Sequence, residues 1–572
     1  MKSRTSHRAG YANYVSVAIA AAVITASSAV PGKAYTFNTS PDWDVELDTN
    51  ISYGLGVRAD ARDSRISNNP IQQNNEYKFP NSGNITSSRF DIASELSAEY
   101  MNDYGFDVSV AGWKDFAYNG GTQNNPGNFA PGFPYSALSS SPSGHYSSYT
   151  NNLYNLGGEL DNAFAFANTN VEGIPVSIKV GRFTEYWGDA VFAGFQAISY
   201  GQSPIDLIKA VDAPGTQVKD LFMPRGQVSV HVQATPEITV GFQYDLEYRP
   251  NRFPEGGTFL GTADPVFIGP QSLAGSAPRS DDYVPPNLNG NFGVELLYAP
   301  DALNGTIGMY FRQFDDPTPY SPFEISLANG QKSYHLAYAQ HVRLYGLSFD
   351  HNIGSLATAI EASVRTNTGL NSVPGGDPAI DPYGHDGARG NILNVVANTI
   401  AALTPTPLWQ TGTAIAEVAW THTLAVTHDK AVYDAVGYAC AAGGINAGNG
   451  ERDGCSTDNN VNLNVLFDPQ WLQVFPGIDL DAPVSVEYGL YGNGQTFGTS
   501  GTGNNAGSVA YSVGIHALIR QKYNVKLDYS GYQSPTGKIA YNGLGQPYYS
   551  TGSGEYMWND KAQVQLTLSY AF

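Results

Sequence analysis

The sequence is poor in charged residues, in cations and in long apolar segments. Only 14% of its 572 residues are charged, and 30 Lys and Arg stand against 51 Asp and Glu, which gives a net charge of −21. A chain this acidic will not bind nucleic acid through a basic patch. Beyond the first 34 residues, no apolar run approaches the roughly 20 residues that a helix needs to cross a bilayer, so helical membrane spans are excluded.

Sequence patterns typical of catalysis are also missing. The chain has no Gly-x-Ser-x-Gly elbow, no His-Glu-x-x-His, no phosphate-binding Walker loop and no Cys-x-x-Cys. Its histidines are scattered and fit positions in a lumen or at a rim better than a ligand set: His341, His351, His422, His428 and His516. We therefore predict a protein that is not an enzyme and that holds neither a cofactor nor a metal.

Cysteine is rare. Cys440 and Cys455 are the only two, and they enclose a short loop rich in Gly, Ala and Asn. In an oxidising compartment, two cysteines around a short polar loop usually pair. No other Cys or His lies inside this loop to form a metal site with them. We predict a disulfide that closes the 440–455 loop and stabilises it by roughly 3 kcal/mol in the loop-entropy description.

The first 34 residues are typical of an export signal. Lys2 and Arg4 belong to a basic start, residues 14–23 are apolar, and small residues follow. Cleavage is expected after Ala29 or Ala34, and Ala34 is preferred because a more ordinary polar chain begins after it. An uncleaved anchor is less favoured, since the apolar run is too short. Without the four basic residues of segment 1–34, the chain 35–572 has 26 basic and 51 acidic residues, a net charge of −25.

The chain ends with the periodicity of a strand. In 557–572 an apolar face alternates with a small or polar one. The apolar residues are Phe572, Tyr570, Leu568, Leu566, Val564 and Ala562. An edge strand of a soluble sandwich shows the same alternation, but a strand that is apolar outward and polar inward can close a transmembrane barrel, where every backbone group is paired. We expect Phe572 and Tyr570 to be the signal that barrel-assembly machinery reads.

Similar alternation recurs along the chain. It begins at Trp43–Val57 and continues in a hairpin of 90–100 with 106–113. Further segments expected as strands include 334–341, 342–351, 410–422 and 424–433. With 62 Gly and 37 Tyr, the pattern predicts an all-β fold: a transmembrane antiparallel β-barrel of about 16 strands with long external loops, such as 118–153, and a short helical insert.

The alternation stops between residues 181 and 224, a segment that we call the insert. Ser203-Pro204-Ile205-Asp206 is typical of a helix start with Ser203 as the cap. A folded segment of this kind narrows or plugs the lumen, or lies on the rim. Its aromatic residues are expected either to form a surface along which an apolar ligand passes or to anchor the insert by packing: Phe183, Tyr186, Trp187, Phe192, Phe195 and Tyr200. Residues expected to hold the insert to the wall are Arg182, Glu185, Asp189, Ser203 and Asp206.

Acidic residues recur on the polar faces of the expected strands. They are Glu46, Asp48, Glu95, Glu99, Asp245, Glu247, Glu295, Glu487 and Asp528. One interpretation is a hydrated wall whose charge is balanced by cations such as Lys179, Arg312, Arg520 and Lys526. The other is a field in the channel that favours cations. The first is preferred, because the insert can cover much of that wall.

Three stretches carry a resemblance to a known family: GRFTEYWGDAVFAG, SPIDLIKAVDAPGTQVKDLFMPRGQVSV and YRPNRFPEGGTFLGTADPV, which lie within 181–266. They resemble successive blocks of a large family of Gram-negative outer-membrane proteins catalogued only as a domain of unknown function. The resemblance extends over essentially the whole chain. It implies a barrel, and a link to the passage of hydrophobic compounds such as terpenes, esters and sterols, but it supplies no binding residues.

These observations favour a channel or transporter for small hydrophobic molecules in the outer membrane of a Gram-negative bacterium. Its partners would be outer-membrane lipid, the barrel-assembly machinery and a small-molecule solute. A water-filled, cation-preferring porin is the alternative of the same class. The large loops also suit a surface adhesin or a structural barrel. A barrel-embedded hydrolase would require a Ser and a His that meet on one wall.

Overall fold

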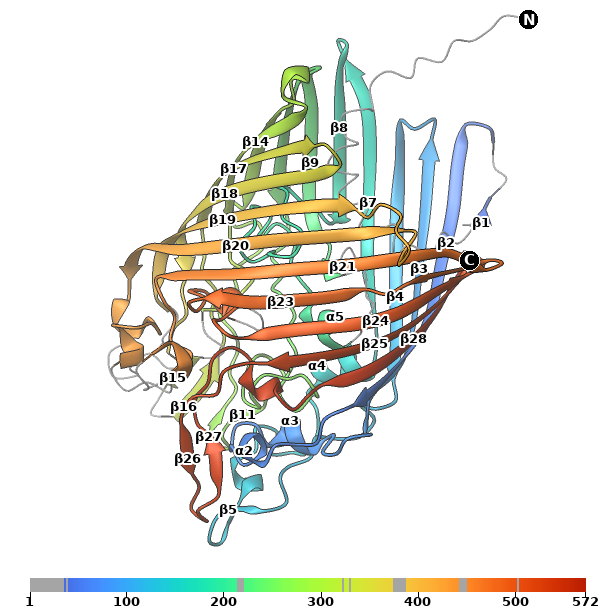
Figure 1. Ribbon diagram of the computed structural model, residues 1–572. Coiled ribbons are helices and arrows are strands. Elements are labelled where there is room, and N and C mark those ends of the chain that lie inside the picture. The colour runs from blue at the N-terminus through green and yellow to red at the C-terminus, as the bar shows by residue number, and fades with distance from the viewer. Residues whose placement is uncertain are drawn as a thin grey trace, which may run out of the picture.

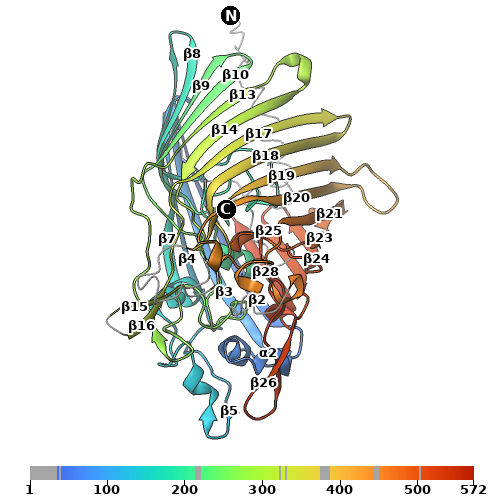
Figure 2. The same ribbon diagram turned by 90° about the vertical axis from the view of Figure 1, so that its left-hand side faces the viewer.

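The strands of the protein form an antiparallel sheet that closes on itself (Figures 1 and 2). This computed structural model describes residues 35–37, 40–212, 221–320, 324–328, 331–373, 387–441, 450–500 and 504–572, so the expected signal in 1–34 lies outside the described residues. Strand β28 (Gln563–Ala571) pairs with β2 (Trp43–Arg58), from Asn50 opposite Ala571 to Arg58 opposite Gln563. The fold is therefore the closed β-barrel that the C-terminal alternation predicts.

Eighteen strands build the wall. The sheet has 20 segments, but β1 (Tyr35–Thr36) is a short addition beside β2, and β22 (Ile478–Asp481) and β23 (Val484–Tyr491) are halves of one strand. The expected number of about 16 is close to this count. The other wall strands are β3 (Ile85–Tyr100), β4 (Tyr104–Asp115), β7 (Leu156–Val171), β8 (Ile174–Phe183), β9 (Arg225–Thr235), β10 (Ile238–Asp245), β13 (Phe292–Tyr298), β14 (Gly305–Phe314), β17 (Val342–Ile353), β18 (Leu356–Gly369), β19 (Arg389–Ala402), β20 (Thr411–His428), β21 (Asn459–Phe475), β24 (Val509–Ile519) and β25 (Tyr523–Gln533).

Apolar and polar side chains alternate along the strands, so they lie on opposite faces of the wall. In β28, Val564 and Leu568 are exposed, whereas Gln563 and Gln565 are buried. Neighbouring strands repeat this arrangement, with Leu527 of β25 on the exposed face. The barrel therefore presents an apolar outer surface, which is the surface that lipid requires.

The strand prediction failed where both faces of a strand are apolar. Strand β19 was missed, because its inward-facing Ile392 and Val396 are buried against loop and insert residues and hide the alternation. Two segments were expected as separate strands, 410–422 and 424–433. A single strand, β20, covers the first and continues to His428, while η4 occupies part of the rest of the second. Segment 334–341 is not part of the wall: β16 (Gln331–His335) pairs with β15 (Glu324–Ala328) within a loop.

Short turns and long loops gather at opposite ends of the barrel. The turn between β3 and β4 spans 101–103, and the turn between β7 and β8 spans 172–173. The long loops pack on one another around buried aromatic residues, among them Phe79, Tyr118 and Phe259. Two loop hairpins project together at the bottom of Figures 1 and 2: β5 (Asn128–Ala130) with β6 (Phe133–Pro134), and β26 (Ile539–Tyr541) with β27 (Pro547–Tyr549). Because long loops face outward in such barrels, we call this the external end.

The remaining elements are short and lie outside the wall strands. They are α2 (Ser64–Ser67), α3 (Gln73–Tyr77), η1 (Tyr135–Leu138), α4 (Ser148–Thr150), η2 (Asn151–Asn155), α5 (Leu207–Asp212), β11 (Ser272–Leu273), β12 (Ala277–Pro278), η3 (Asp301–Leu303), η4 (Lys430–Val432), η5 (Ala439–Ala441), η6 (Glu451–Asp453), η7 (Phe497–Thr499) and η8 (Tyr556–Trp558). Across the described ranges, no helix is long and apolar enough to span a membrane.

Candidate functional site

The described part of the insert lies inside the barrel. Its first three residues belong to β8, which ends at Phe183, and β9 begins at Arg225, so its described remainder comprises 184–212 and 221–224. This remainder is hydrogen-bonded to inward-facing side chains of β10, β14, β18, β19, β20 and β21. Lys209 also pairs with Glu159 of β7, and the carbonyl of Gly201 accepts from Arg225 of β9. The described part of the insert is therefore attached to the part of the wall that runs from β7 to β21.

Two wall carboxylates hold the backbone of the insert. Glu417 of β20 accepts hydrogen bonds from the backbone N–H groups of Val191, Phe192 and Ala193, at 2.6, 2.7 and 2.6 Å. Glu361 of β18 accepts from the N–H groups of two more insert residues, Asp189 and Ile198, both at 2.8 Å. Both carboxylates are buried. A buried carboxyl group whose oxygens accept several N–H groups has its hydrogen-bonding capacity satisfied, and it fixes the backbone that donates to it.

A glycine permits this close approach. Gly188 has a φ of +86°, and a Cβ atom at this position would lie 2.5 Å from Oε2 of Glu361. Both the left-handed backbone and the missing side chain are therefore required where the insert turns toward Glu361. Any larger residue at 188 would displace the insert from β18.

Cations and amides of the wall hold other backbone groups. Arg312 of β14 donates to the carbonyl oxygens of Ile198 and Tyr200, at 2.9 and 2.7 Å, and Asn398 of β19 donates to that of Asp189 at 2.7 Å. Because the bonds reach backbone atoms from several strands, the position of this part of the insert is fixed relative to the wall.

Most of the predicted aromatic residues are packed rather than open to the lumen. Trp187 and Tyr200 belong to a buried cluster with Tyr310 and Phe314 of β14. Phe183 is also buried, and its ring lies 5.5 Å from that of Phe164. Phe195 is partly buried against the same cluster as Trp187, and a Cβ atom on Gly498 would collide with its ring. The anchoring alternative thus describes the positions of these four.

The two remaining aromatic residues are accessible. Tyr186 is 40% exposed and Phe192 is 38% exposed. The hydroxyl of Tyr186 donates to the carbonyl of Ala190 at 2.8 Å, which holds its ring in place. These two side chains are therefore the candidates on the insert for contact with a passing apolar solute.

The residues expected to anchor the insert make different kinds of contact. Arg182 forms an ion pair with Glu247 at 3.3 Å, and Glu185 lies 3.7 Å from the imidazole of His231. Asp189 is held through its backbone, as described above, while burial raises the pKa of its carboxyl group to about 6. Arg182, Glu185 and Asp189 thus lie at the junction of insert and wall, but the strongest attachments come from wall residues.

The expected helix cap at Ser203 is wrong. Helix α5 begins at Leu207, and Asp206 accepts from the N–H groups of Ile208 and Lys209, both at 3.1 Å, so Asp206 is the cap. The residues before it are extended, because Ile205 pairs with Phe222 across the insert. The Ser203 hydroxyl instead donates to the carbonyl of Glu185 at 2.9 Å. The Asp206 carboxylate also pairs with Arg252 at 2.8 Å, which joins the insert to the next external loop.

The wall formed by β2, β3 and β4 carries acidic side chains on its inner face. Asp48 and Glu95, which are paired across β2 and β3, are exposed to solvent, and Asp107 of β4 is half-buried. The hydrogen bonds described above attach the insert to other strands. Acidic side chains that solvent reaches therefore lie on this side of the lumen.

Elsewhere in the lumen, histidines sit between carboxylates. His516 lies 2.8 Å from Asp481 and 2.9 Å from Asp528, and His231 lies 3.1 Å from Glu295. Within the described ranges, no three His, Cys, Asp or Glu residues are grouped as metal ligands. These histidines can reduce the negative charge of the lumen when they are protonated.

Cys440 and Cys455 form a disulfide with a Cα–Cα distance of 5.8 Å, and both are buried. The bond connects η5 to the second residue after η6, in the external loop between β20 and β21. Residues 442–449 of the enclosed loop lie outside the described residues.

Both backbone groups of Phe572 pair with Thr49 of β2. The N–H of Phe572 donates to the carbonyl of Thr49 at 3.0 Å, and the N–H of Thr49 donates back at 2.9 Å. The rings of Phe572 and Tyr570 are stacked 5.4 Å apart on the outer face. Their role as an assembly signal remains a prediction.

Sequence reasoning missed the two residues that hold the insert most directly. Glu361 and Glu417 were not among the predicted lumen carboxylates. A signal was present: each is a lone acid within a run of apolar and small residues, AIEAS and AIAEVA. A lone carboxylate flanked in this way on a strand requires a buried partner.

Comparisons with known proteins give a family but no function. The family described as "Protein of unknown function (DUF1302)" matches residues 15–572. Among curated proteins, no match is found. The chain is similar to OpdK of Pseudomonas aeruginosa, solved with vanillate, at 10% identity and a TM-score of 0.40 over 92% of this chain and 98% of that one. It is also similar to OccAB1 of Acinetobacter baumannii, at 10% identity and a TM-score of 0.42 over 95% of this chain and 98% of that one. The outer membrane channel DcaP of Acinetobacter baumannii is similar at 8% identity and a TM-score of 0.36, over 94% of this chain and 99% of that one.

Proposed function

We propose, since the chain belongs to the DUF1302 family of proteins of unknown function, that it is an outer-membrane channel in which small hydrophobic molecules pass beside a folded insert. The observation that carries the proposal is the attachment of the insert inside the barrel through Glu361 and Glu417. A lumen that is narrowed on one side and open to solvent on the other suits the selective passage of small solutes.

The location in the outer membrane is supported by the barrel surface. A closed sheet with an apolar outer face satisfies its backbone groups internally, which is the requirement for spanning lipid. The signal expected in 1–34 would direct export, and Phe572 with Tyr570 would then be read by the assembly machinery. Outer-membrane lipid would cover exposed side chains such as Leu347 and Ile515.

The hydrophobic class of solute is supported by the accessible aromatic residues of the insert. Tyr186 and Phe192 keep about two-fifths of their surface exposed inside an otherwise packed segment. Aromatic side chains provide large apolar contact areas, and sites for small molecules are mostly apolar with a few polar groups. These two residues are the proposed contact surface.

A cation-preferring porin is the second candidate, and a specific observation favours it. Asp48 and Glu95 are exposed on the wall that the insert leaves open. Carboxylates in a confined passage concentrate cations and repel anions. Transport of a hydrophobic solute and preference for cations are compatible if the route is wet.

Planar-bilayer recordings and liposome flux test the proposal together. Replacing 184–224 with a short Gly/Ser bridge should raise ion conductance several-fold and reduce the flux of a hydrophobic solute. A matched control shortens the external hairpin β26–β27, which should change neither quantity. If the intact protein already conducts strongly and the deletion changes nothing, the open porin is the better description. If neither ions nor solutes pass through the intact protein or the variant without the insert, the result supports the adhesin alternative.

A further inference from the structure

One external loop is buried along most of its length. In the loop between β10 and β13, the fifteen residues from Phe253 to Phe267 are all buried, and none of them belongs to a helix or a strand. Connecting loops normally run over the surface of a protein, where water pairs their backbone groups. A loop that is buried to this degree must have its backbone groups paired within the protein.

Three loops around the barrel contact the segment 253–267. The loop between β4 and β7 does so through the hydroxyl of Tyr118, which accepts from a backbone N–H of the segment at 3.2 Å. The loop between β14 and β17 packs Leu336 into one buried cluster with Phe267. The loop between β23 and β24 places the ring of Phe497 5.3 Å from that of Phe267.

These three loops are evenly spaced around the wall. In the ring of strands, β8, β9, β10 and β13 lie between the first loop and the second. Strands β18, β19, β20 and β21 lie between the second and the third. Strands β25, β28, β2 and β3 lie between the third and the first. A segment that contacts all three loops therefore lies across the middle of the external end, where it covers the mouth of the barrel.

The segment is also packed against itself. A Cβ atom on Gly256 would lie 1.9 Å from the carbonyl oxygen of Asp264, and one on Gly261 would lie 2.3 Å from that of Glu255, so only glycine permits these approaches. The carboxyl group of Glu255 accepts from the N–H of Ile268 at 3.1 Å and brings the two ends together. Loops with close ends that pack on themselves are compact units and are frequently functional.

One side chain of α3 holds the segment at three backbone groups. Asn75 donates to the carbonyl oxygens of Gly261 and Thr262, both at 2.9 Å, and its own amide oxygen accepts from the N–H of Gly257. Asn75 is 0% exposed. It is therefore a positioning residue, because without it these three backbone groups lose a partner in a buried environment.

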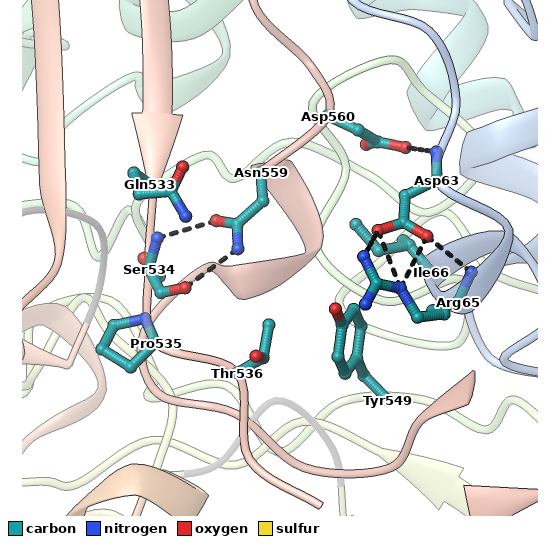
Figure 3. A pocket seen from close by; sticks show the side chains of 10 residues that line it. All are labelled: Asp63, Arg65, Ile66, Gln533, Ser534, Pro535, Thr536, Tyr549, Asn559 and Asp560. Carbon is teal, nitrogen blue, oxygen red and sulfur yellow. Dashed lines mark hydrogen bonds and ion pairs between the residues drawn. The ribbon is translucent and has the colours of Figure 1, made fainter. Parts of the chain in front are cut away.

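The loops that surround the segment are joined to one another. Asp560 of the last external loop accepts from the N–H of Asp63 in the first external loop at 2.6 Å (Figure 3). The hydroxyl of Tyr135, in the loop between β4 and β7, donates to the carbonyl of Asn68 in the first loop at 2.7 Å. These loops form a connected frame, so a displacement of the segment 253–267 would open the mouth without breaking the frame.

From this arrangement we infer that the segment 253–267 is a gate at the external mouth, which closes the channel in this structure and is displaced when a solute passes. The inference rests on the proposed function, since a gate requires a channel. The two obstructions then have separate roles. The insert, which is bound to the wall, sets the conductance of the open channel, whereas the segment 253–267 sets the fraction of time for which the channel is open.

A reversible cross-link tests the gate. A Cβ atom on Gly257 would lie 3.7 Å from the Cβ atom of Asn74 in α3, which is a separation that a disulfide spans. With Cys440 and Cys455 changed to Ser, the pair Asn74→Cys and Gly257→Cys should form a disulfide that nearly abolishes channel openings in planar bilayers, and a reductant should restore them. Each single cysteine variant is a control that the reductant should leave unchanged. Gly257→Cys alone also carries the strain of a side chain at a φ of +85°.

Releasing the segment should have the opposite effect. Asn75→Ala removes three hydrogen bonds from it, so the open probability should rise at least about tenfold while the amplitude of the open level stays constant. Asn81→Ala, at an exposed position of the same external loop, is the matched control and should change neither quantity. Heat-modifiable migration on a gel establishes that each variant is folded.

The outcomes distinguish a failure of the gate from a failure of the proposed function. If the cross-linked protein conducts as well as the reduced one, or if Asn75→Ala leaves the open probability unchanged, the protein is a channel but the segment 253–267 is not its gate. Free thiols at 74 and 257 under oxidising conditions would contradict the contact itself. If neither the wild type nor any variant passes ions or solutes, cross-linked or reduced, the proposed function is wrong, and the gate is wrong with it.

Discussion

The carboxylate of Glu417 lies 2.7 Å from the backbone nitrogen of Phe192, 225 residues earlier in the chain. This contact joins β20 to the insert across the lumen, and the N–H groups of Val191 and Ala193 share the same carboxylate. A single side chain thus determines where three consecutive insert residues lie, and the neighbouring Phe192 ring stays accessible as a consequence.

Replacing Glu417 with Gln should loosen the insert. The amide group presents one NH₂ toward backbone N–H groups, so at least one hydrogen bond is lost and a repulsive contact forms. We expect the single-channel conductance to increase about two- to fivefold, with more frequent transitions between open levels. Glu172→Gln, on a short exposed turn, is the control. An unchanged conductance with the insert still protected from protease would show that the other contacts are sufficient.

Charge on the open wall should control ion selectivity separately from the insert. The double change Asp48→Asn and Glu95→Gln removes two exposed lumen charges without touching the described insert. The reversal potential in a salt gradient should shift toward zero, because the field that concentrates cations is weakened, and the shift should be larger in dilute salt, where screening is weak. The conductance in concentrated salt should stay near that of the wild type. A reversal potential that does not move would place the selective charges elsewhere.

The barrel was predictable from sequence to a degree that the insert was not. Alternation in β28 and β2 is visible because one face meets lipid and the other meets water. In β19 the inner face meets the insert, so Ile392 and Val396 are apolar there and the pattern disappears. The contacts of Glu361 and Glu417 join residues far apart in sequence, and no local pattern specifies such a pairing. Ser203 matched a helix cap locally, but the pairing of Ile205 with Phe222 extended the backbone there and moved the cap to Asp206.

Trp187 and Phe192, which sequence reasoning treated alike, should respond differently to truncation. Trp187 is 3% exposed, so Trp187→Ala leaves a cavity and should cost about 3–5 kcal/mol of packing. We expect it to release the insert and raise ion conductance. Phe192→Ala removes an accessible ring and should reduce the flux of a hydrophobic solute while ion conductance stays constant. Leu347→Ala, on the lipid face, serves as the control. If Trp187→Ala and Phe192→Ala change ion conductance and solute flux equally, the assignment of packing to Trp187 and of solute contact to Phe192 is wrong.

The disulfide should stabilise its loop and not the barrel. With Cys440 and Cys455 both changed to Ser, the external loop between β20 and β21 loses a cross-link worth about 3 kcal/mol in the loop-entropy description. Protease cleavage within this loop should become at least several-fold faster, while heat-modifiable migration of the barrel stays unchanged, since the closed strand pairing remains. Thiol labelling of the wild type under non-reducing conditions provides the first measurement. Two readily labelled thiols in the exported protein would count against the disulfide.

The external loops should loosen as the pH rises. Burial raises the pKa of Glu255 to about 8 and that of Asp264 to about 7. Glu255 accepts from the N–H of Ile268 at 3.1 Å, which closes the 255–269 loop. Asp264 accepts from the N–H groups of Asn74 and Asn75 at 2.8 and 3.0 Å, which joins this loop to α3.

Because both pKa values lie above those of the unfolded chain, the folded loops bind more protons than the unfolded ones, and their stability is greatest at low pH and falls as the pH passes through 7 and 8. Hydrogen exchange of residues 70–79 and 255–269, corrected for the intrinsic effect of pH, should therefore increase several-fold between pH 6 and pH 9. Glu255→Gln, which stays neutral at every pH, should reduce this dependence, whereas Asp301→Asn on an exposed turn should preserve it. Corrected exchange that is constant with pH in the wild type would mean that these carboxyl groups are ionised throughout, with their charge stabilised by the N–H groups they accept from.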